Sequence, residues 1–260
     1  MNDKALQKSG IPGYLQDYKG GQLQDNFDST DIAIPQVRLL QGVSEAISLF
    51  DDAKVGEFWH TGMDQPLGDE LKFVIASRRK RYLLQAPMDD GQGILARADD
   101  GATWDRLGKW SVKVDKKTTV DWEISDLNVE KSGLTQWGTF DPTDSQSPPA
   151  ATLFYDYLVL LPDHMEFGPA VISLARSAIR KARRGLNDKI SLHQRNQRPM
   201  QSVMFAAQSS LESGDTGDFF TWGFRQMGFA DEDVFNQAMA LGKEMTDYRV
   251  KDEVGAEESA

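Results

Sequence analysis

Short apolar runs and alternating hydrophobic and polar positions dominate the chain from about residue 34 to residue 224. Seven segments combine strand length with β-branched or aromatic content and are separated by turn residues. They are LKFVIA (71–76), RYLLQA (81–86), WSVKVD (110–115), TTVDWEI (118–124), LFYDYLVLLP (153–162), SVMFAAQSS (202–210) and FFTWGF (219–224). The pattern predicts a β-rich body in which KVDKKTTV forms a hairpin, with its turn at residues 115–117.

Two segments have helical periodicity instead. In GPAVISLARSAIRKARRGL (168–186), Pro169 suits the first helical position and Gly185 the position after the last turn. Apolar residues of this segment recur on one stripe, and its arginines share another face. The segment DEDVFNQAMALGKEM (231–245) predicts a second helix with Asp231 as its N-cap. The expected fold class is therefore α+β and β-rich.

The domain organisation follows from composition. Residues 1–30 are rich in Gly, Gln and Asp and predict a loosely ordered arm, whereas residues 31–245 predict a single domain. DPTDSQSPP (141–149) is a long polar loop that could mark a subdomain boundary. Residues 246–260 form an acidic tail, whose acids are Asp252, Glu253, Glu257 and Glu258. No segment approaches the roughly 20 apolar residues of a membrane span, so we expect a cytoplasmic protein without a membrane partner.

Charge is unevenly distributed along the chain. The formal net charge is -11, yet residues 171–200 hold eight cations and one acid, a local +7, which leaves -18 for the remainder. Such an average field repels polyanions from most of the surface. Cysteine is absent, which excludes disulfides and thiolate metal sites.

Basic residues with aromatic neighbours are the strongest candidate chemistry. Single-stranded nucleic acid is held by cations that follow the phosphates and by aromatic faces on which bases stack. The predicted phosphate contacts are Arg78, Arg79, Lys80, Arg81, Arg97, Lys113 and Lys116, and the predicted stacking residues are Tyr82, Trp104 and Trp110. The alternative is that Tyr82, Trp104 and Trp122 are core residues of a β-sheet and that the lysines lie on its solvent-exposed side. The helix face of Arg176, Arg180, Arg183 and Arg184 would extend this groove or receive the acidic tail. In a strand through residues 78–82, Arg79 and Arg81 share one face, and burial of either face would require its cations to extend to solvent or to find acids. A short strand at a sheet edge, or a strand that lines a groove, would avoid this cost.

Sequence support for catalysis is weak. The three histidines lie far apart, and the phosphate-loop, nucleophile-elbow and dinucleotide motifs are absent. A metal-dependent nuclease using Asp89, Asp90, Asp99, Asp100 and Asp105 stays open, although turns explain these residues more simply. We therefore predict no catalytic residues, no metal and no cofactor.

Eight blocks together resemble a poorly annotated family of bacteriophage proteins, over roughly residues 34–230. They are IPQVRLLQG (34–42), GEFWHT (56–61), RKRYLL (79–84), GILARADDGATW (93–104), SGLTQWG (132–138), PAAT (149–152), LPDH (161–164) and GDFFTWGF (217–224). More distantly, the order of β-rich body, basic helix and acidic tail resembles the single-stranded-DNA-binding proteins of tailed phages. That resemblance implies an OB-like antiparallel barrel with additional helices, in a host cytoplasm. The chain departs from those proteins because many of their tails end in an aromatic residue and this one ends in Ala260.

The sequence thus predicts a protein that binds single-stranded DNA without sequence preference during phage replication or recombination. Replication or recombination proteins would contact the tail, and a homodimer stays open. The alternative is a virion or assembly protein without DNA affinity, whose cationic helix contacts the acidic surface of another subunit.

Overall fold

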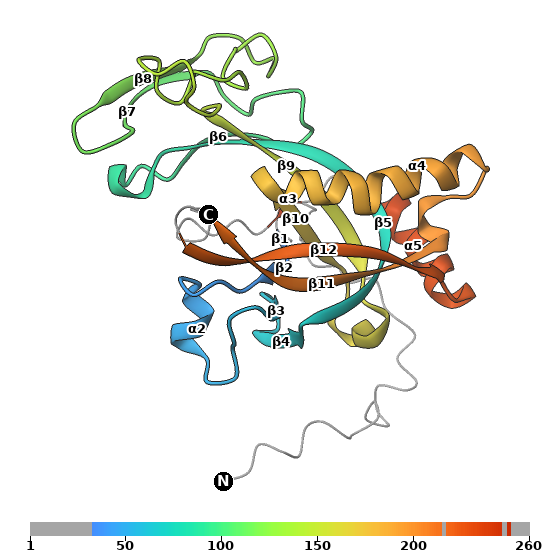
Figure 1. The fold of residues 1–260 in the computed structure, drawn as a ribbon. Coiled ribbons are helices and arrows are strands. Elements are labelled where there is room, and N and C mark those ends of the chain that lie inside the picture. The colour runs from blue at the N-terminus through green and yellow to red at the C-terminus, as the bar shows by residue number, and fades with distance from the viewer. Residues whose placement is uncertain (1–32, 215–216, 246–248, 251–260) are drawn as a thin grey trace, which may run out of the picture.

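The computed structural model describes residues 33–214, 217–245 and 249–250, and it has the predicted β-rich α+β composition (Figure 1). Its strands are β1 (Ala33–Ile34), β2 (Gln36–Leu39), β3 (Phe58–His60), β4 (Gln65–Gly68), β5 (Glu70–Gln85), β6 (Ile94–Ala98), β7 (Gly108–Lys113), β8 (Thr119–Ile124), β9 (Ala151–Leu160), β10 (Ala170–Ala175), β11 (Val203–Gly214), β12 (Gly217–Phe229) and β13 (Arg249–Val250). Its α-helices are α2 (Glu45–Leu49), α3 (Arg176–Ala182), α4 (Asp188–Arg195) and α5 (Glu232–Glu244). A π-helical turn η3 (Arg183–Asn187) joins α3 to α4, and short 3₁₀ turns are η1 (Met88–Asp90), η2 (Pro162–Phe167) and η4 (Met200–Ser202).

One curled sheet forms the body of the protein (Figure 1). Within the described residues it has nine strands in the order β12-β11-β5-β9-β10-β2-β3-β4, with β6 paired to the second half of β5. The β10–β2 pair is parallel and the other pairs are antiparallel. The end strands β12 and β4 do not pair with each other in this part of the chain. The sheet is therefore an open half-barrel, and no closed five-stranded barrel of the OB type is established.

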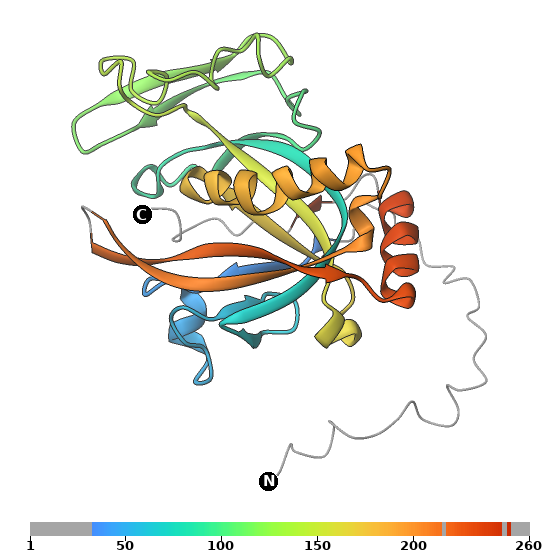
Figure 2. The ribbon, with the colours of Figure 1, turned by 45° about the vertical axis from the view of Figure 1, so that its right-hand side comes forward.

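Helices cover both faces of the sheet (Figure 2). Alternation along β9 separates the two layers: Tyr155 and Tyr157 belong to the core under α3 and α4, whereas Leu158 and Leu160 belong to the core under α5. The predicted second helix is confirmed, because α5 follows Asp231 and packs onto the sheet around the fully buried Ala238.

The first predicted helix is wrong at both ends. Residues 170–175 form β10, which pairs with β9 and β2, and the helix begins only at Arg176. It continues past Gly185, which lies inside the π-helical turn against Phe224 of β12. The apolar run AVISLA suits a buried strand as well as a helix, and pairing with two neighbouring strands decides between them.

A separate lobe stands at the upper end of the sheet (Figure 1). We call residues 86–150 the upper lobe. It contains β6 and the β7–β8 hairpin, and it has its own hydrophobic core around Trp104 and Trp122. The predicted hairpin turn is confirmed, since Asp115 Oδ1 accepts hydrogen bonds from the backbone N–H groups of Lys117 and Thr118.

Candidate nucleic-acid interface

The basic run on β5 is the centre of the predicted site. LKFVIA and RYLLQA, predicted as two strands, are the two halves of β5, and the run lies between them on the same strand. Its ladder with β9 extends over the run, pairing Arg78 with Tyr157 and Arg79 with Asp156. Strand alternation therefore sends neighbouring cations to opposite faces of the sheet.

One face of the run is buried around an acid. Arg81 and Asp156 are fully buried, and Arg81 Nε donates to Asp156 Oδ2 at 2.8 Å. Arg79 Nε lies 3.5 Å from the same oxygen, and Ser173 Oγ on β10 donates to Asp156 Oδ1 at 2.5 Å. The guanidinium of Arg81 also lies 4.7 Å from the ring centre of Phe154. Arg81 is thus a structural residue rather than the predicted groove contact, because a fully buried guanidinium presents no surface to a phosphate.

The other face of the run points toward the helix from Arg176 to Arg195, which comprises α3, η3 and α4 and which we call the long helix. Arg78 and Lys80 are exposed, and Arg78 Nη1 donates to Asn187 Oδ1 at 2.9 Å. The Tyr157 hydroxyl donates to the same amide oxygen at 2.9 Å, and burial raises the pKa of Tyr157 so that it stays protonated. Asn187 lies in η3, so this turn fixes the helix to β5 and β9 at the position of the basic run.

Two arginines from different elements meet on one aromatic ring. The guanidinium carbon of Arg78 lies 5.5 Å from the ring centre of Tyr155, and that of Arg183 lies 5.8 Å from the same centre. Arg183 Nε also donates to the Tyr155 hydroxyl at 3.4 Å. Within the described residues, neither guanidinium contacts a carboxylate. The result is a concentration of positive charge without local compensation, which favours an anion.

The long helix is rich in exposed cations. Ile179, Leu186 and Ile190 face the sheet. The exposed cations of this helix are Arg176, Arg180, Arg183, Arg184, Lys189 and Arg195. The predicted helix face is therefore accessible. The turn η3 contacts the sheet at two places, through Asn187 with Arg78 of β5 and through Gly185 with Phe224 of β12.

The predicted stacking residues lie elsewhere, on or beside the upper lobe. Trp104 is only 1% exposed, whereas Tyr82 and Trp110 are half-buried against the core of the lobe. The burial of Trp104 leaves no ring face for a base, so its predicted stacking role is not supported by its position. Trp104 is therefore a core residue of the upper lobe, and Tyr82 and Trp110 pack against that core.

The remaining predicted cations of the groove also belong to the upper lobe. Arg97 is half-buried on β6, and its backbone N–H donates to Asp105 Oδ1 at 2.9 Å. Lys113 is exposed at the end of β7, and Lys116 is exposed in the hairpin turn. Lys113 and Lys116 thus belong to the β7–β8 hairpin, which stands in the upper lobe apart from α4 in Figure 1.

The acidic clusters have local structural partners. Asp90 Oδ1 accepts from the Lys113 backbone N–H at 2.9 Å, and Asp100 Oδ1 accepts from Ala102 and Thr103 at 2.8 and 2.7 Å. Burial alone raises the pKa of Asp100, but these N–H groups outweigh it and hold the pKa below its ordinary value. In the described segments, no three side chains of the metal-binding types gather into a site. The turn interpretation of Asp100 is therefore supported directly by its hydrogen bonds.

Parts of the predicted organisation lie outside the described residues. The arm of residues 1–30 lies outside them, as do the tail acids Asp252, Glu253, Glu257 and Glu258. Of the predicted tail, residues 249–250 are described: they form β13, which pairs in parallel with β1. Among the helices of the described segments, none has the length and apolar character that a membrane-spanning helix needs.

Sequence reasoning missed several residues beside the helix. Asn187 was not predicted because its role depends on two strands that are distant in sequence. Phe229 ends β12 and is 56% exposed, with the guanidinium of Arg198 5.4 Å from its ring centre and His193 in edge contact. Phe229 is thus an accessible aromatic residue at the α4 end of the helix.

The fold and the site together define a β-rich α+β protein that carries a cationic helix across a curled sheet. The chain belongs to the Pam3 phage gp34-like protein family, whose model matches residues 3–251. The predicted membership of a bacteriophage protein family is confirmed. The comparisons with curated proteins and with solved structures found no match.

Proposed function

We propose that the protein binds single-stranded DNA without sequence preference and acts in phage DNA replication or recombination. The observation that carries this proposal is the convergence of Arg78 and Arg183 on Tyr155 without a carboxylate in contact with either guanidinium in the described chain. Like charges repel, and a bound phosphate between them would turn that repulsion into two attractive contacts.

The proposed interface follows the long helix rather than the upper lobe. At 1.5 Å per residue, the helix from Arg176 to Arg195 is about 30 Å long, and it presents Arg180, Arg183 and Arg184 to solvent. Lys80 extends the interface onto β5. At the α4 end of the helix, the exposed ring of Phe229 could stack on a base. Such stacking contributes roughly 1–3 kcal/mol per base. Stacking would favour single strands because duplex bases are not accessible.

The local charge explains how a protein with net charge -11 could bind DNA. The helix from Arg176 to Arg195 has seven cations and one acid, a net charge of +6. The electrostatic potential close to the helix is therefore positive, because screening weakens the contribution of the more distant acids. The acidic tail would compete for this helix and contact replication or recombination proteins when DNA displaces it. In this proposal the curled sheet supports the helix and takes the place of the predicted OB-like barrel.

The test is fluorescence anisotropy of labelled oligothymidine at several salt concentrations, with duplex DNA as competitor. Arg180→Ala/Arg183→Ala should weaken binding roughly 10–100-fold at about 50 mM salt and reduce the log–log salt slope by about 1.4, since each single-strand phosphate contact contributes about 0.7. Lys117→Ala/Lys131→Ala removes two exposed lysines of the upper lobe and should bind as the unaltered protein does. An unaltered protein that fails to bind at low salt would refute the proposal.

The alternative, a virion or assembly protein, is favoured by a different observation. The upper lobe exposes large apolar side chains, among them Trp137 at 71%, Met88 at 67% and Leu107 at 57%. Exposed apolar groups are typical of contact surfaces when they are contiguous. This alternative predicts a stable oligomer by light scattering and no affinity for DNA, whereas the main proposal predicts DNA binding whatever the oligomeric state.

A further inference from the structure

A pocket lies where the long helix meets the outermost strand of the sheet. Its volume is about 300 Å³, and its lining residues are Lys181, Arg184, Gly185, Lys189, Phe224, Arg225 and Gln226. The first four belong to the helix and the last three to β12. A volume of this size is at the lower end of ligand pockets, which are roughly 300–1,000 Å³, and far exceeds the roughly 30 Å³ of a water molecule.

The π-helical turn and a glycine create the close approach beside this pocket. A Cβ atom on Gly185 would lie 2.6 Å from Phe224 Cβ, so the helix backbone touches β12 at a distance that no larger residue permits. In addition, β12 is the end strand of the sheet, so one of its sides has no strand neighbour in the described chain. The pocket is thus bounded by two fixed backbone elements rather than by surface side chains alone.

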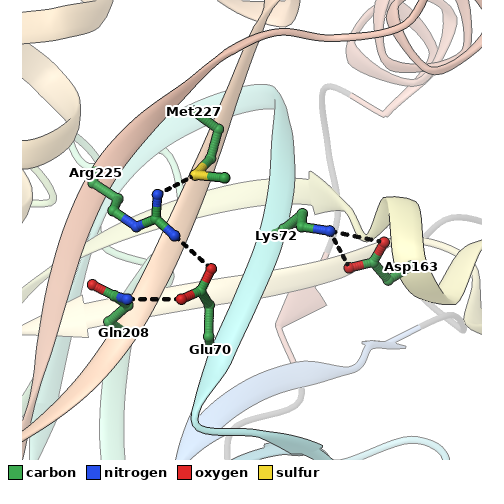
Figure 3. Close-up of polar contacts among 6 residues, drawn as sticks. All are labelled: Glu70, Lys72, Asp163, Gln208, Arg225 and Met227. Carbon is green, nitrogen blue, oxygen red and sulfur yellow. Dashed lines mark hydrogen bonds and ion pairs between the residues drawn. The ribbon is translucent and has the colours of Figure 1, made fainter.

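Strand alternation decides which groups of β12 face the pocket. Phe224 packs into the core under the helix, and Gln226 Oε1 lies 3.3 Å from His193 Nε2, so both face the helix. The guanidinium of Arg225 is engaged elsewhere: Nη2 donates to Glu70 Oε1 at 2.6 Å and Nη1 to the Met227 sulfur (Figure 3). The other carboxylate oxygen of Glu70 accepts from Gln208 at 2.7 Å. Arg225 is therefore compensated.

The charge of the pocket comes from two helix cations. Lys181 forms an ion pair with Glu212 of β11. Arg184 and Lys189, in contrast, form no ion pair with any residue that the structure describes. They are five residues apart in the sequence, across the π-helical turn, and both line the same pocket. Two uncompensated cations at a concave site are suited to a phosphate group.

We propose that this pocket is a phosphate-binding subsite, with Arg184 and Lys189 as the contacting cations. The inference rests on the proposed DNA-binding function. It adds that one phosphate of the bound strand occupies a defined site on the β12 side of the helix. The strand would cross from Arg78 and Arg183 on one side of the helix to this pocket on the other. The same chemistry would also accept a free phosphate, so the test separates a DNA strand from that source.

The test uses the full-length protein labelled with ¹⁵N-glycine and follows the amide resonance of Gly185 by NMR. Separate titrations add 5′-hydroxyl oligothymidine, 5′-phosphorylated oligothymidine and inorganic phosphate. Both oligonucleotides should shift the resonance saturably at similar concentrations, because the pocket takes an internal phosphate. A shift confined to the 5′-phosphorylated strand would assign the pocket to a strand end and overturn the crossing path.

Neutral variants test the two cations. Arg184→Gln/Lys189→Gln should abolish the Gly185 shift, weaken oligothymidine binding roughly 10–100-fold at about 50 mM salt and reduce the salt slope by about 1.4. Lys117→Gln/Lys131→Gln removes the same charge from the upper lobe and should leave the shift and affinity unchanged. Thermal unfolding should show that both variants are folded.

The failures of the two proposals are distinguishable. If anisotropy shows binding but Gly185 does not respond and the helix variant binds normally, the pocket is refuted and the DNA-binding function stands. If inorganic phosphate shifts Gly185 but oligothymidine binds nowhere, the DNA-binding function is refuted and the pocket is a free-phosphate site. If no probe binds, both proposals are refuted.

Discussion

The helix from Arg176 to Arg195 and the upper lobe have the same number of basic residues and opposite net charge. The helix has seven cations and one acid, a net +6, whereas residues 86–150 have seven cations and twelve acids, a net -5. Cations of the lobe pair locally, as Lys109 does with Asp121 at 3.0 Å, and its tryptophans at 104 and 122 are buried. The helix has exposed arginines, and the exposed ring of Phe229 lies at its α4 end. Local charge balance therefore distinguishes the two regions better than the proximity of basic and aromatic residues in sequence.

The buried end of the basic run gives the first way to test this comparison. Asp156→Asn would leave Arg79 and Arg81 without the acid they share, and removing one partner of a buried ion pair costs about 3–5 kcal/mol of unfolding free energy. Urea denaturation measures this loss. If the variant keeps full stability but loses affinity for DNA, Arg79 and Arg81 act at the interface after all.

The lobe provides the second test. Trp104→Ala should lower the free energy of unfolding by about 3–5 kcal/mol, because it removes a large ring from the core of the lobe. Affinity for oligothymidine, measured below the unfolding transition, should not change. Weaker binding by a fully stable variant would restore Trp104 as a stacking residue.

The π-helical turn offers the third test, now on the helix. Gly185→Ala places a Cβ against Phe224 and should cost about 1–3 kcal/mol as overpacking, with weaker DNA binding because the helix moves from β12. Chemical denaturation and anisotropy on the same sample measure the two effects. A control is Gly133→Ala in the lobe, where an added Cβ would meet no atom within 4 Å but φ is +74°. Any loss of unfolding free energy in that variant therefore reports backbone strain alone.

The predicted lysines of the lobe give the fourth test. Lys113→Ala/Lys116→Ala should change affinity for oligothymidine by less than about twofold, since net negative charge surrounds them and screening limits their reach to the helix. Anisotropy at about 50 mM salt is the most sensitive condition. A loss as large as that of Arg180→Ala/Arg183→Ala would show that the groove includes the lobe.

The smallest expected effect concerns acid stability of the lobe. The backbone N–H groups of Lys117 and Thr118 hold the pKa of Asp115 below its ordinary value. A carboxyl with a lowered folded-state pKa stabilises the fold above its unfolded value of about 3.9, and this contribution is lost as pH falls through the folded value. Asp115→Asn should therefore be less stable than the unaltered protein at pH 7 and equal to it near pH 2. Urea unfolding at both pH values measures the difference, and a constant difference would contradict it.

Much of the local structure was predictable because its cause is local. Asp115 identified the hairpin turn, Asp231 preceded α5, and β-branched and aromatic runs marked the strands. Part of the constraint on the basic run was predictable: alternation puts Arg79 and Arg81 on one face, where burial requires that they extend to solvent or find an acid, and Asp156 is the acid that they share. Which acid would serve was not predictable, since it lies on another strand.

The boundary between β10 and α3 shows why the rest was not predictable. AVISLA and the arginine-rich segment after it fit one continuous apolar stripe, and only the ladders with β9 and β2 make the first part a strand. Likewise, nothing local distinguishes the buried Trp104 from the exposed Trp137 or Phe229, because the packing of distant segments determines exposure.

Composition, short-range periodicity and shared blocks of residues are enough to establish the β-rich α+β class, the basic character of residues 171–200 and the bacteriophage family. The burial of Arg81 and the meeting of Arg78 with Arg183 on Tyr155 are visible only in the folded chain, as is the pocket that Arg184 and Lys189 share with β12. Burial, ion pairing and concavity depend on which distant segments pack together, and strand order fixes that packing.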